Sequence, residues 1–206
     1  MNALTWDDLV NELHLNIDNV RDSCSRAHPT FVPKLPSIII SNELADCLES
    51  CYKGNTNLYT NYIIEESLKI SGFSKKICFD SHLNLIDSDS EADYDSEADS
   101  DSEADSDKGF ILVLGENKQR TFTVTTNSHE TVLIHTIYLM DSLRNNKTSY
   151  GIISYGIWWE FYTMDNFGKV YSGGQWISID RPQSGFSNSK GVAKVLSWIV
   201  WILQNI

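Results

Sequence analysis

The chain has 206 residues, of which 41% are hydrophobic and 11% are aromatic, and its formal net charge is −12. This composition predicts a folded domain with a sizeable core and excludes a globally disordered chain. The charge is concentrated in residues 87–107, which hold 11 of the 28 acidic residues and no lysine or arginine. The rest has 17 acidic and 16 basic residues, so overall charge neither favours nor excludes a polyanionic partner.

The sequence predicts an intracellular protein that does not associate with a membrane. The N-terminus lacks a basic segment followed by an apolar one, as a secretory signal would have. The four cysteines form no C-x-x-C pair and are expected to be reduced thiols. The apolar stretch KVLSWIVWILQNI is about 13 residues long, where a span needs roughly 20. We therefore expect it to be a docked core helix.

The first 40 residues predict a helical section followed by a linker. Apolar residues recur near helical spacing between residues 3 and 27, with acidic residues early, which favours a helix over this range. Residues 28–37, HPTFVPKLPS, contain three prolines and predict a break in regular structure. We therefore divide the chain into an N-terminal section, residues 1–40, and a main domain, residues 41–206.

A second helical section is expected from Ser41 to about Ser71. Ser41 or Asn42 is suited to cap its start, because short polar side chains accept hydrogen bonds from the first helical amides. The sequence KGNTN at 53–57 predicts an interruption. Gly72 stands where a helix C-cap often carries glycine.

Two strand-like runs follow, KICFDSHLNLID at 76–87 and GFILVLGENKQRTFTVTT at 109–126, with the acidic segment between them. In that segment SEAD recurs at 90, 96 and 102, a period of six that matches neither an amphipathic face nor a solenoid repeat. Its like charges oppose collapse. We expect a disordered insertion over residues 87–108, within the turn of a hairpin formed by the two runs.

The remaining chain predicts a helix over residues 129–146, whose inward residues are Val132, Leu133, Thr136, Ile137 and Met140. One strand is expected at 150–165 and another at 169–179, joined by the turn DNFG. A closing helix is expected to begin at 187–190. The order of elements predicts an α/β (α+β) domain with a mixed central sheet flanked by helices.

Three charged residues near the acidic segment suggest chemistry. Asp80 follows apolar residues of the first run, and Glu116 and Lys118 end the apolar part of the second. Residues two apart on a strand face the same side, so Glu116 and Lys118 are expected to project together, and Asp80 joins them if the runs pair. Two carboxylates at one point of a sheet offer hard oxygen ligands to Mg²⁺. Such a metal generates a hydroxide nucleophile and stabilises charge on a phosphodiester.

This pattern resembles the PD-(D/E)XK nuclease superfamily, in which an Asp on one strand precedes Glu-x-Lys on the next, followed by a helix and a strand. TNYIIEESLKISGF at 60–73 is similar to the leading helix of these enzymes, and YGIISYGIWWEFYTMD to the late strands of restriction-enzyme-like members. The resemblance covers residues 41–206. It implies a restriction-endonuclease-like fold and metal-dependent hydrolysis of nucleic acid, with Mg²⁺ or Mn²⁺ as cofactor.

The resemblance implies a catalytic set of four residues: Asp80, Glu116, Lys118 and Glu66. Its three carboxylates would hold the metal, and the lysine would position the nucleophile. Glu65 is an alternative to Glu66, and Asp87 is an alternative to Asp80. The chain departs from the family pattern at Phe79, which stands where the motif's name has proline.

A second class of function stays open, a nuclease-fold protein that has lost catalysis and binds protein or nucleic acid. Near the implied site the only basic pairs are Lys75 with Lys76 and Lys118 with Arg120, a small positive surface for nucleic acid. The expected partner is therefore DNA or RNA for an active enzyme, and a protein or a nucleic acid for a binding module.

The aromatic and acidic segments each have more than one interpretation. Trp158, Trp159, Phe161 and Tyr162 could stack on bases, but we favour a role in the core and at the strand edge, and we read Trp176 as packing. For the acidic segment we favour a solvated loop over a polyanion that competes with nucleic acid. Regulation is a third interpretation, because four serines have an acidic residue three positions on: Ser88, Ser90, Ser96 and Ser102.

Overall fold

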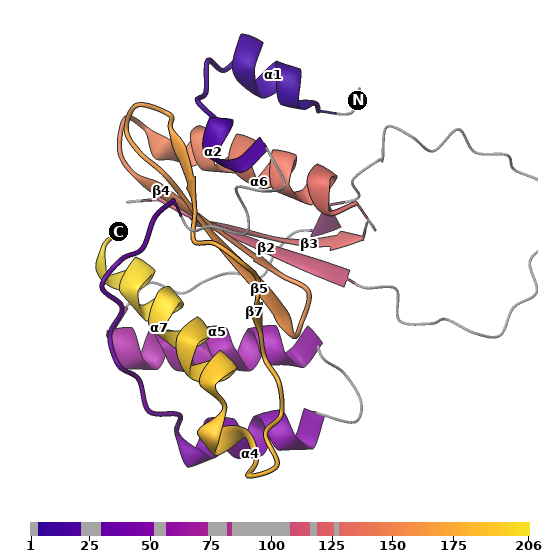
Figure 1. Cartoon of the computed structure of the whole chain (residues 1–206), viewed down its shortest axis with the longest axis vertical. Coiled ribbons are helices and arrows are strands. Elements are labelled where there is room, and N and C mark those ends of the chain that lie inside the picture. The colour runs from indigo at the N-terminus through magenta and orange to yellow at the C-terminus, as the bar shows by residue number, and fades with distance from the viewer. Residues whose placement is uncertain are drawn as a thin grey trace, which may run out of the picture.

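The computed structural model describes residues 4–21, 30–51, 57–73, 82–83, 108–115, 119–125 and 128–206. The fold is α+β (Figure 1). The helices are α1 (Trp6–Asn11), α2 (Asp18–Arg21), α4 (Asn42–Cys51), α5 (Asn57–Ser71), α6 (His129–Arg144) and α7 (Lys190–Gln204), with a short 3-10 helix at Phe186–Asn188. The strands are β1 (His82–Leu83), β2 (Lys108–Leu114), β3 (Gln119–Thr125), β4 (Ser149–Ser154), β5 (Trp158–Met164), β6 (Val170–Ser172) and β7 (Ile177–Ser178).

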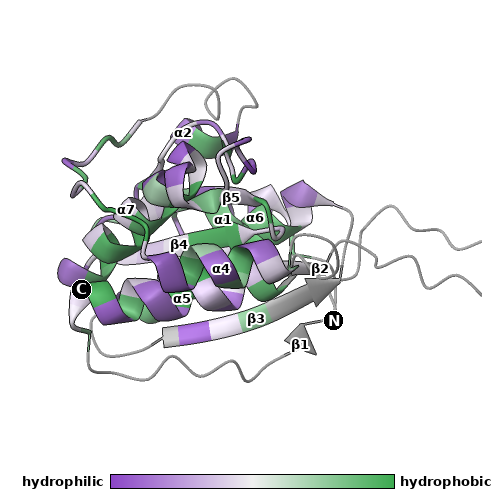
Figure 2. Ribbon diagram, turned by 90° about the horizontal axis from the view of Figure 1, so that it is seen from below, coloured by the Kyte–Doolittle hydropathy of each residue, from purple (hydrophilic) through white to green (hydrophobic). Residues whose placement is uncertain are grey.

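The strands form one sheet in the order β1-β3-β2-β4-β5-β6, and β7 also pairs with β5. Neighbouring strands are antiparallel except β1 and β3, which are parallel. Helices α6, α1 and α2 lie on one side of the sheet, and α4, α5 and α7 lie on the other (Figure 1). The hydropathy of the ribbon follows this layering, since β4 and α7 are strongly hydrophobic while α4 and α5 alternate hydrophilic and hydrophobic residues (Figure 2).

Two hydrophobic clusters fill the two sides of the sheet, and β2 contributes to both. Ile111 and Val113 belong to the cluster beneath α6, whereas Leu112 and Leu114 belong to the cluster beneath α5 and α7. All four side chains are buried. A strand covered on both faces needs apolar residues at every position, which explains the continuous apolar run in its sequence.

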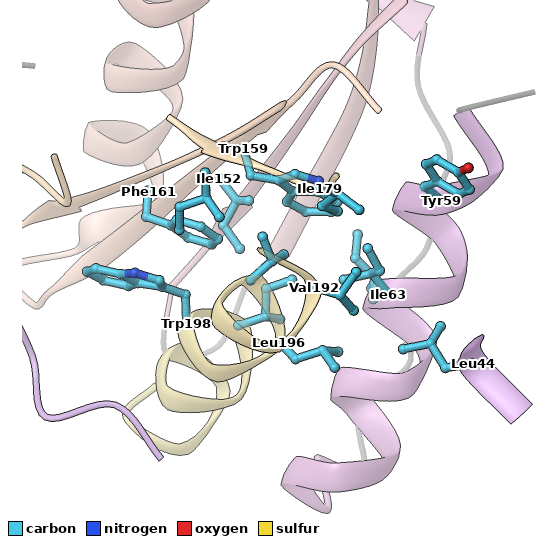
Figure 3. Packing of buried hydrophobic residues seen from close by; sticks show 14 of the residues in the cluster. Leu44, Tyr59, Ile63, Ile152, Trp159, Phe161, Ile179, Val192, Leu196 and Trp198 are labelled. Atoms are coloured by element: carbon cyan, nitrogen blue, oxygen red, sulfur yellow. The ribbon is translucent and has the colours of Figure 1, made fainter. Parts of the chain in front are cut away.

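Trp159 is the largest fully buried side chain. It lies in the cluster between the sheet and α7, near Ile179 and Val192 (Figure 3). Its indole Nε1 donates a hydrogen bond to the carbonyl oxygen of Gly156 at 2.9 Å. The ring is therefore both packed and satisfied, as a buried tryptophan requires.

Several predicted helices are confirmed at their ends. The section from residue 41 is split into α4 and α5, Ser41 Oγ accepts from the amide of Leu44, and Gly72 has a left-handed φ of 69°. Helix α6 buries all five residues predicted to face inward. The C-terminal stretch forms α7, which is docked in the core as expected. Among the described helices none is long and apolar enough to cross a membrane.

The helix predicted over residues 3–27 is wrong. Helix α1 ends at Asn11, and Asn16 pairs with Lys169 in an isolated parallel bridge. Leu15 and Ile17 are both buried, a spacing of two that belongs to extended chain rather than to a helix. His14 has a left-handed φ of 54°, which ends the helical path. Both short helices pack into the cluster beneath α6, to which they contribute Leu9 and Val20.

The run at 109–126 is a hairpin and not a single strand. β2 and β3 pair antiparallel, and Leu114 is the partner of Gln119. Four polar or glycine residues, GENK, connect them, a length typical of a hairpin loop. Residues of the first run pair with β3 in parallel, His82 opposite Thr123, so the expected hairpin with β2 is also wrong. β2 begins at Lys108, and the rest of the predicted insertion lies outside the described residues.

Each of the two late strands predicted is divided in two. Residues 150–165 fold back between β4 and β5 at Tyr155–Ile157, where Gly156 has a φ of 71°. Residues 169–179 break between β6 and β7 at two glycines. The composition is uniformly strand-forming across both breaks, so glycine alone marks them.

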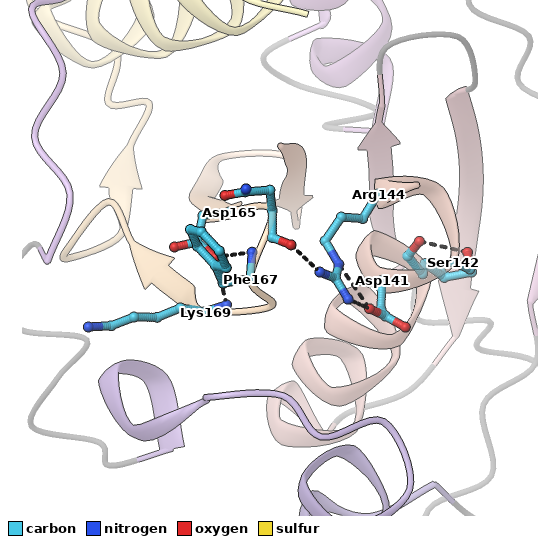
Figure 4. Close-up of polar contacts among 8 residues, drawn as sticks. Asp141, Ser142, Arg144, Asp165, Phe167 and Lys169 are labelled. Carbon is cyan, nitrogen blue, oxygen red and sulfur yellow. Dashed lines mark hydrogen bonds and ion pairs between the residues drawn. The ribbon is translucent and has the colours of Figure 1, made fainter. Parts of the chain in front are cut away.

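The turn DNFG is confirmed, and side chains hold it firmly (Figure 4). Asp165 Oδ1 accepts hydrogen bonds from the amides of Phe167 at 2.9 Å and Lys169 at 3.0 Å. Arg144, at the end of α6, donates to the carbonyl oxygen of Asn166 at 2.7 Å. This network ties the β5–β6 turn to α6, and the position of α6 matters for the site described next.

Candidate functional site

Three of the four residues predicted to be catalytic, Asp80, Glu116 and Lys118, lie outside the described residues, as does the alternative Asp87. Their proximity to one another stays a prediction. Glu116 and Lys118 fall in the connection between Leu114 and Gln119.

Glu66, the fourth, is buried on α5 with its Oε2 3.7 Å from Lys69 Nζ. Lys69 Nζ also lies 3.8 Å from Glu43 Oε2 on α4. Thr60 lies on the side of α5 that faces the sheet, because its hydroxyl forms a hydrogen bond of 3.0 Å with the hydroxyl of Ser154 in β4. At about 100° per residue, Glu66 is turned about 120° from Thr60 around the helix, toward α4. Glu65 is exposed.

The described part of the chain contains no group of three or more His, Cys, Asp or Glu side chains that could hold a metal ion. It does contain a buried cluster of polar side chains around a single carboxylate, which the sequence did not suggest. Glu160, in the middle of β5, is only 3% exposed. Its Oε2 lies 2.7 Å from His129 Nε2 and accepts a hydrogen bond from the Tyr162 hydroxyl at 2.7 Å.

Strand alternation and a helix start bring these residues together. Glu160 and Tyr162 are two apart on β5, so both project toward α6, whereas Trp159 projects into the opposite cluster. His129 is the first residue of α6, which begins there because the hydroxyl of Ser128 accepts from the amide of Thr131 at 3.2 Å. The cap thereby sets the position of the imidazole over the sheet.

The two carboxylate oxygens of Glu160 differ in their hydrogen bonding. Oε2 lies within hydrogen-bonding distance of both neighbours, the imidazole Nε2 of His129 and the hydroxyl of Tyr162. Oε1 is shielded from solvent and has no hydrogen-bond partner within the described residues. A buried polar atom in this state costs about 1–3 kcal/mol, and more when the group is charged. Most buried polar atoms are paired, so this one requires an explanation.

Aromatic rings surround the cluster on its outer side. The ring centroid of His129 lies 5.0 Å from that of Trp176, and Tyr155 stacks on Trp176 with centroids 5.8 Å apart and an interplanar angle of 6°. Trp158 meets Trp176 at 67° with centroids 5.9 Å apart. We call Tyr155, Trp158 and Trp176 the aromatic corner, and the corner together with Glu160, His129 and Tyr162 the Glu160 site.

The aromatic corner presents its indoles to solvent. Trp158 is 42% exposed and Trp176 is 37% exposed, although both belong to or adjoin strands. β7 pairs with β5 so that Ile177 is opposite Trp159, and continuing this register by one residue sets Trp176 beside Glu160. Two large apolar side chains are thus held at the surface by the strands that also position the buried Glu160.

A second carboxylate, that of Glu130, lies next to the Glu160 site in the chain. Glu130, next to His129, accepts a hydrogen bond from the indole of Trp6. Among the residues whose side chains the structure describes, no lysine or arginine forms an ion pair with Glu130 or Glu160. Phe110 near the start of β2 is paired with Ser154 at the end of β4, so β2 begins at the end of the sheet where this site lies.

The sequence interpretation missed this site because its parts are far apart in the chain. Trp159, Phe161 and Tyr162 are buried as expected, but Trp158 and Trp176 are not core residues. The available signal was Glu160 itself, a charged residue at an inward position of a strand whose flanking residues are aromatic. Comparison of the chain with protein-family models, with curated proteins and with solved structures finds no match in any of the three.

Proposed function

We propose that this chain is a binding module and that its ligand docks on the aromatic corner of the Glu160 site. The observation that carries the proposal is the pairing of a buried, half-satisfied carboxylate with two exposed indoles. Stability alone favours neither feature, since an apolar residue at position 160 would avoid the desolvation cost and polar residues at 158 and 176 would suit the surface. Tryptophan is also enriched among the residues that dominate binding energy.

The rigidity of the corner supports this function. Trp158 is part of β5, and Trp176 directly precedes β7, so neither indole sits on a long loop. Trp176 is further fixed by contacts with Tyr155 and His129. A preordered aromatic surface loses little conformational entropy when a ligand binds, which improves affinity.

The indole N–H resonances of the six tryptophans provide the test, assigned by Trp→Phe variants. During titration with a nucleotide, a basic peptide and a methylated basic peptide, we expect at least one probe to shift Trp158 and Trp176. Trp159, buried in the opposite cluster, is the internal control and should stay unchanged. If no probe moves the two corner resonances selectively, the chain does not bind these ligands at the corner and the proposal fails.

A nuclease is the second candidate, with a restriction-endonuclease-like arrangement and Mg²⁺ or Mn²⁺ held by Asp80, Glu116 and Glu66. One observation favours it. Because β1 and β3 are parallel, the chain before each strand leads to the same end of the sheet. Asp80 precedes β1 by two residues, and Glu116 and Lys118 directly precede β3. The order of α5, three strands, α6 and β4 also agrees with the resemblance.

Cleavage of DNA and RNA with Mg²⁺ or Mn²⁺ tests this second candidate. We expect Lys118→Ala to lower the cleavage rate about a hundredfold or more, because a positioned lysine that orients water contributes on this scale. Lys34→Ala, at an exposed position before α4, is the matched control. A cleavage rate that is unchanged in Lys118→Ala would rule out the assigned mechanism, whether or not residues 87–107 are deleted.

A further inference from the structure

We infer that Cys47 and Cys51 are a reversible redox pair, which oxidised glutathione converts to a disulfide. Closure of this bond opens the last turn of α4 and separates Glu49 from the segment before α7. The inference is independent of the proposed binding function. It follows from the spacing of the two thiols on α4, from their different burial and from the contacts of Glu49, which lies between them in the chain.

The two thiols lie one turn apart on the same side of α4. Both cysteines are free, and residues four apart in a helix differ by only about 40° around its axis. Tyr62 on α5 lies near both, because the charge of Cys51, then burial and then the charge of Cys47 raise the pKa of its hydroxyl. That hydroxyl also forms a hydrogen bond with the Cys51 thiol. Both thiols therefore point toward the boundary between α4 and α5.

A disulfide between the two cysteines requires only a local change in α4. Side chains four apart on a helix have Cβ atoms about 5–6 Å apart, whereas a disulfide needs a separation of about 3.5–4.5 Å. Cys51 is the last residue of α4, so only the final turn has to open. The resulting bond is strained by the rest of the helix, and strained disulfides are the ones that thiols reduce readily.

The burial of the two cysteines sets the order of the reaction. Cys47 is half-buried, whereas Cys51 is only 8% exposed. The Cys47 thiolate attacks one sulfur of oxidised glutathione, whose S–S bond breaks as the first glutathione leaves. The Cys51 thiolate then attacks the Cys47 sulfur and expels the second. Two cysteine thiols are oxidised, and one glutathione disulfide is reduced to two thiols that take up the two protons.

Glu49 connects the thiol pair to the segment before α7. It lies about 200° around the helix from Cys47, so it points away from the thiols. Its Oε2 accepts a hydrogen bond from Arg181 Nε at 2.7 Å, and its Oε1 accepts one from the amide of Phe186 at 3.2 Å. Residues 47–51 cannot leave the helical path without moving Glu49. The disulfide is therefore expected to break both contacts.

Peptide mapping of the full chain tests the pairing directly. Trypsin cleaves after Lys34 and Lys53, and no lysine or arginine lies between them, so one peptide carries both Cys47 and Cys51. After equilibration with oxidised glutathione we expect this peptide to lose the mass of two hydrogen atoms and to resist alkylation at both cysteines. Reduced glutathione should restore both thiols. Pairing of either residue with Cys24 or Cys78 would appear as cross-linked peptides.

Hydrogen exchange tests the link to Glu49. In the oxidised protein the Phe186 amide loses its acceptor and should exchange about tenfold faster or more, while the amides of β2 stay unchanged. The Cys51→Ser protein cannot close the bond, so it is expected to retain glutathione on Cys47 and to keep the slow exchange of Phe186. The Cys47→Ser protein should stay reduced, because Cys51 is buried.

Three results would overturn the inference. Two thiols that remain open to alkylation in oxidised glutathione would show that the pair is not redox-active. Glutathione retained on Cys47 of the parent protein, or a cross-link to another cysteine, would show that Cys47 and Cys51 do not pair. A Cys47–Cys51 disulfide that leaves the exchange of Phe186 unchanged would contradict the opening of α4. None of these results concerns the aromatic corner, so the binding function is tested separately.

Discussion

Replacing Trp159 with alanine is expected to lower the free energy of unfolding by about 4 kcal/mol, the usual scale for removing a large buried aromatic side chain. Trp159 is fully buried between the sheet and α7. The substitution leaves a large cavity and removes the indole that donates to Gly156, so that carbonyl loses its partner. Chemical denaturation monitored by circular dichroism measures the effect.

The neighbouring tryptophan provides the matched control. Trp158 projects from the other face of β5 and is 42% exposed, so Trp158→Ala should cost less than about 1 kcal/mol. The two variants remove the same side chain from adjacent positions and differ only in the face of the sheet. Equal losses of stability would contradict the register of β5, and with it the position of Glu160.

Replacing Gly191 with alanine is the second large effect expected, a loss of about 3 kcal/mol. An ideal Cβ at this position would lie 2.0 Å from the carbonyl oxygen of Ser178 in β7. The clash is with backbone, so either β7 or the first turn of α7 must move. Because β7 adjoins Trp176, the same change is expected to disturb the aromatic corner.

The sign of the Gly191→Ala effect makes it informative. Alanine normally stabilises a helix by about 1 kcal/mol relative to glycine, so propensity alone predicts an increase in stability. Gly72→Ala is the control for backbone strain without crowding, because Gly72 has a φ of 69° and a Cβ there would meet nothing within 4 Å. It should cost about 1–2 kcal/mol. Thermal melting measures the stability of both variants. A Gly191→Ala protein that is more stable than the parent would contradict the contact between β7 and α7.

Helices α4, α5, α6 and α7 could be predicted from the sequence because their signals are local. α6 and α7 each combine a capping serine, Ser128 or Ser189, with an apolar face that repeats at helical spacing. The strands could not be counted in the same way. β2, β4 and β5 are buried on both faces, so their apolar runs continue without a polar period, and only Gly156 marked the reversal in YGIISYGIWWEFYTMD.

The pairing of β1 was not predictable because it depends on nonlocal contacts. The sequence placed the strands on either side of the acidic segment together, whereas β1 lies at the sheet edge beside β3. The Glu160 site was not predicted for the same reason. Glu160 and His129 are 31 residues apart and meet only through the packing of α6 on the sheet. A charged residue in a buried strand indicated that a partner must exist, but not which one.

The central claim is that Glu160 is retained for binding and not for stability, and one variant tests it most directly. Glu160→Gln keeps the size of the side chain, retains an oxygen acceptor for His129 and Tyr162, and removes the buried charge. The measurement is the free energy of unfolding together with the affinity for the probe that shifts the Trp158 and Trp176 indole resonances. We predict unfolding within about 1 kcal/mol of the parent protein, or more stable, and an affinity about tenfold weaker. A variant destabilised by more than about 2 kcal/mol whose affinity for that probe is unchanged would show that Glu160 is structural, and would contradict the account.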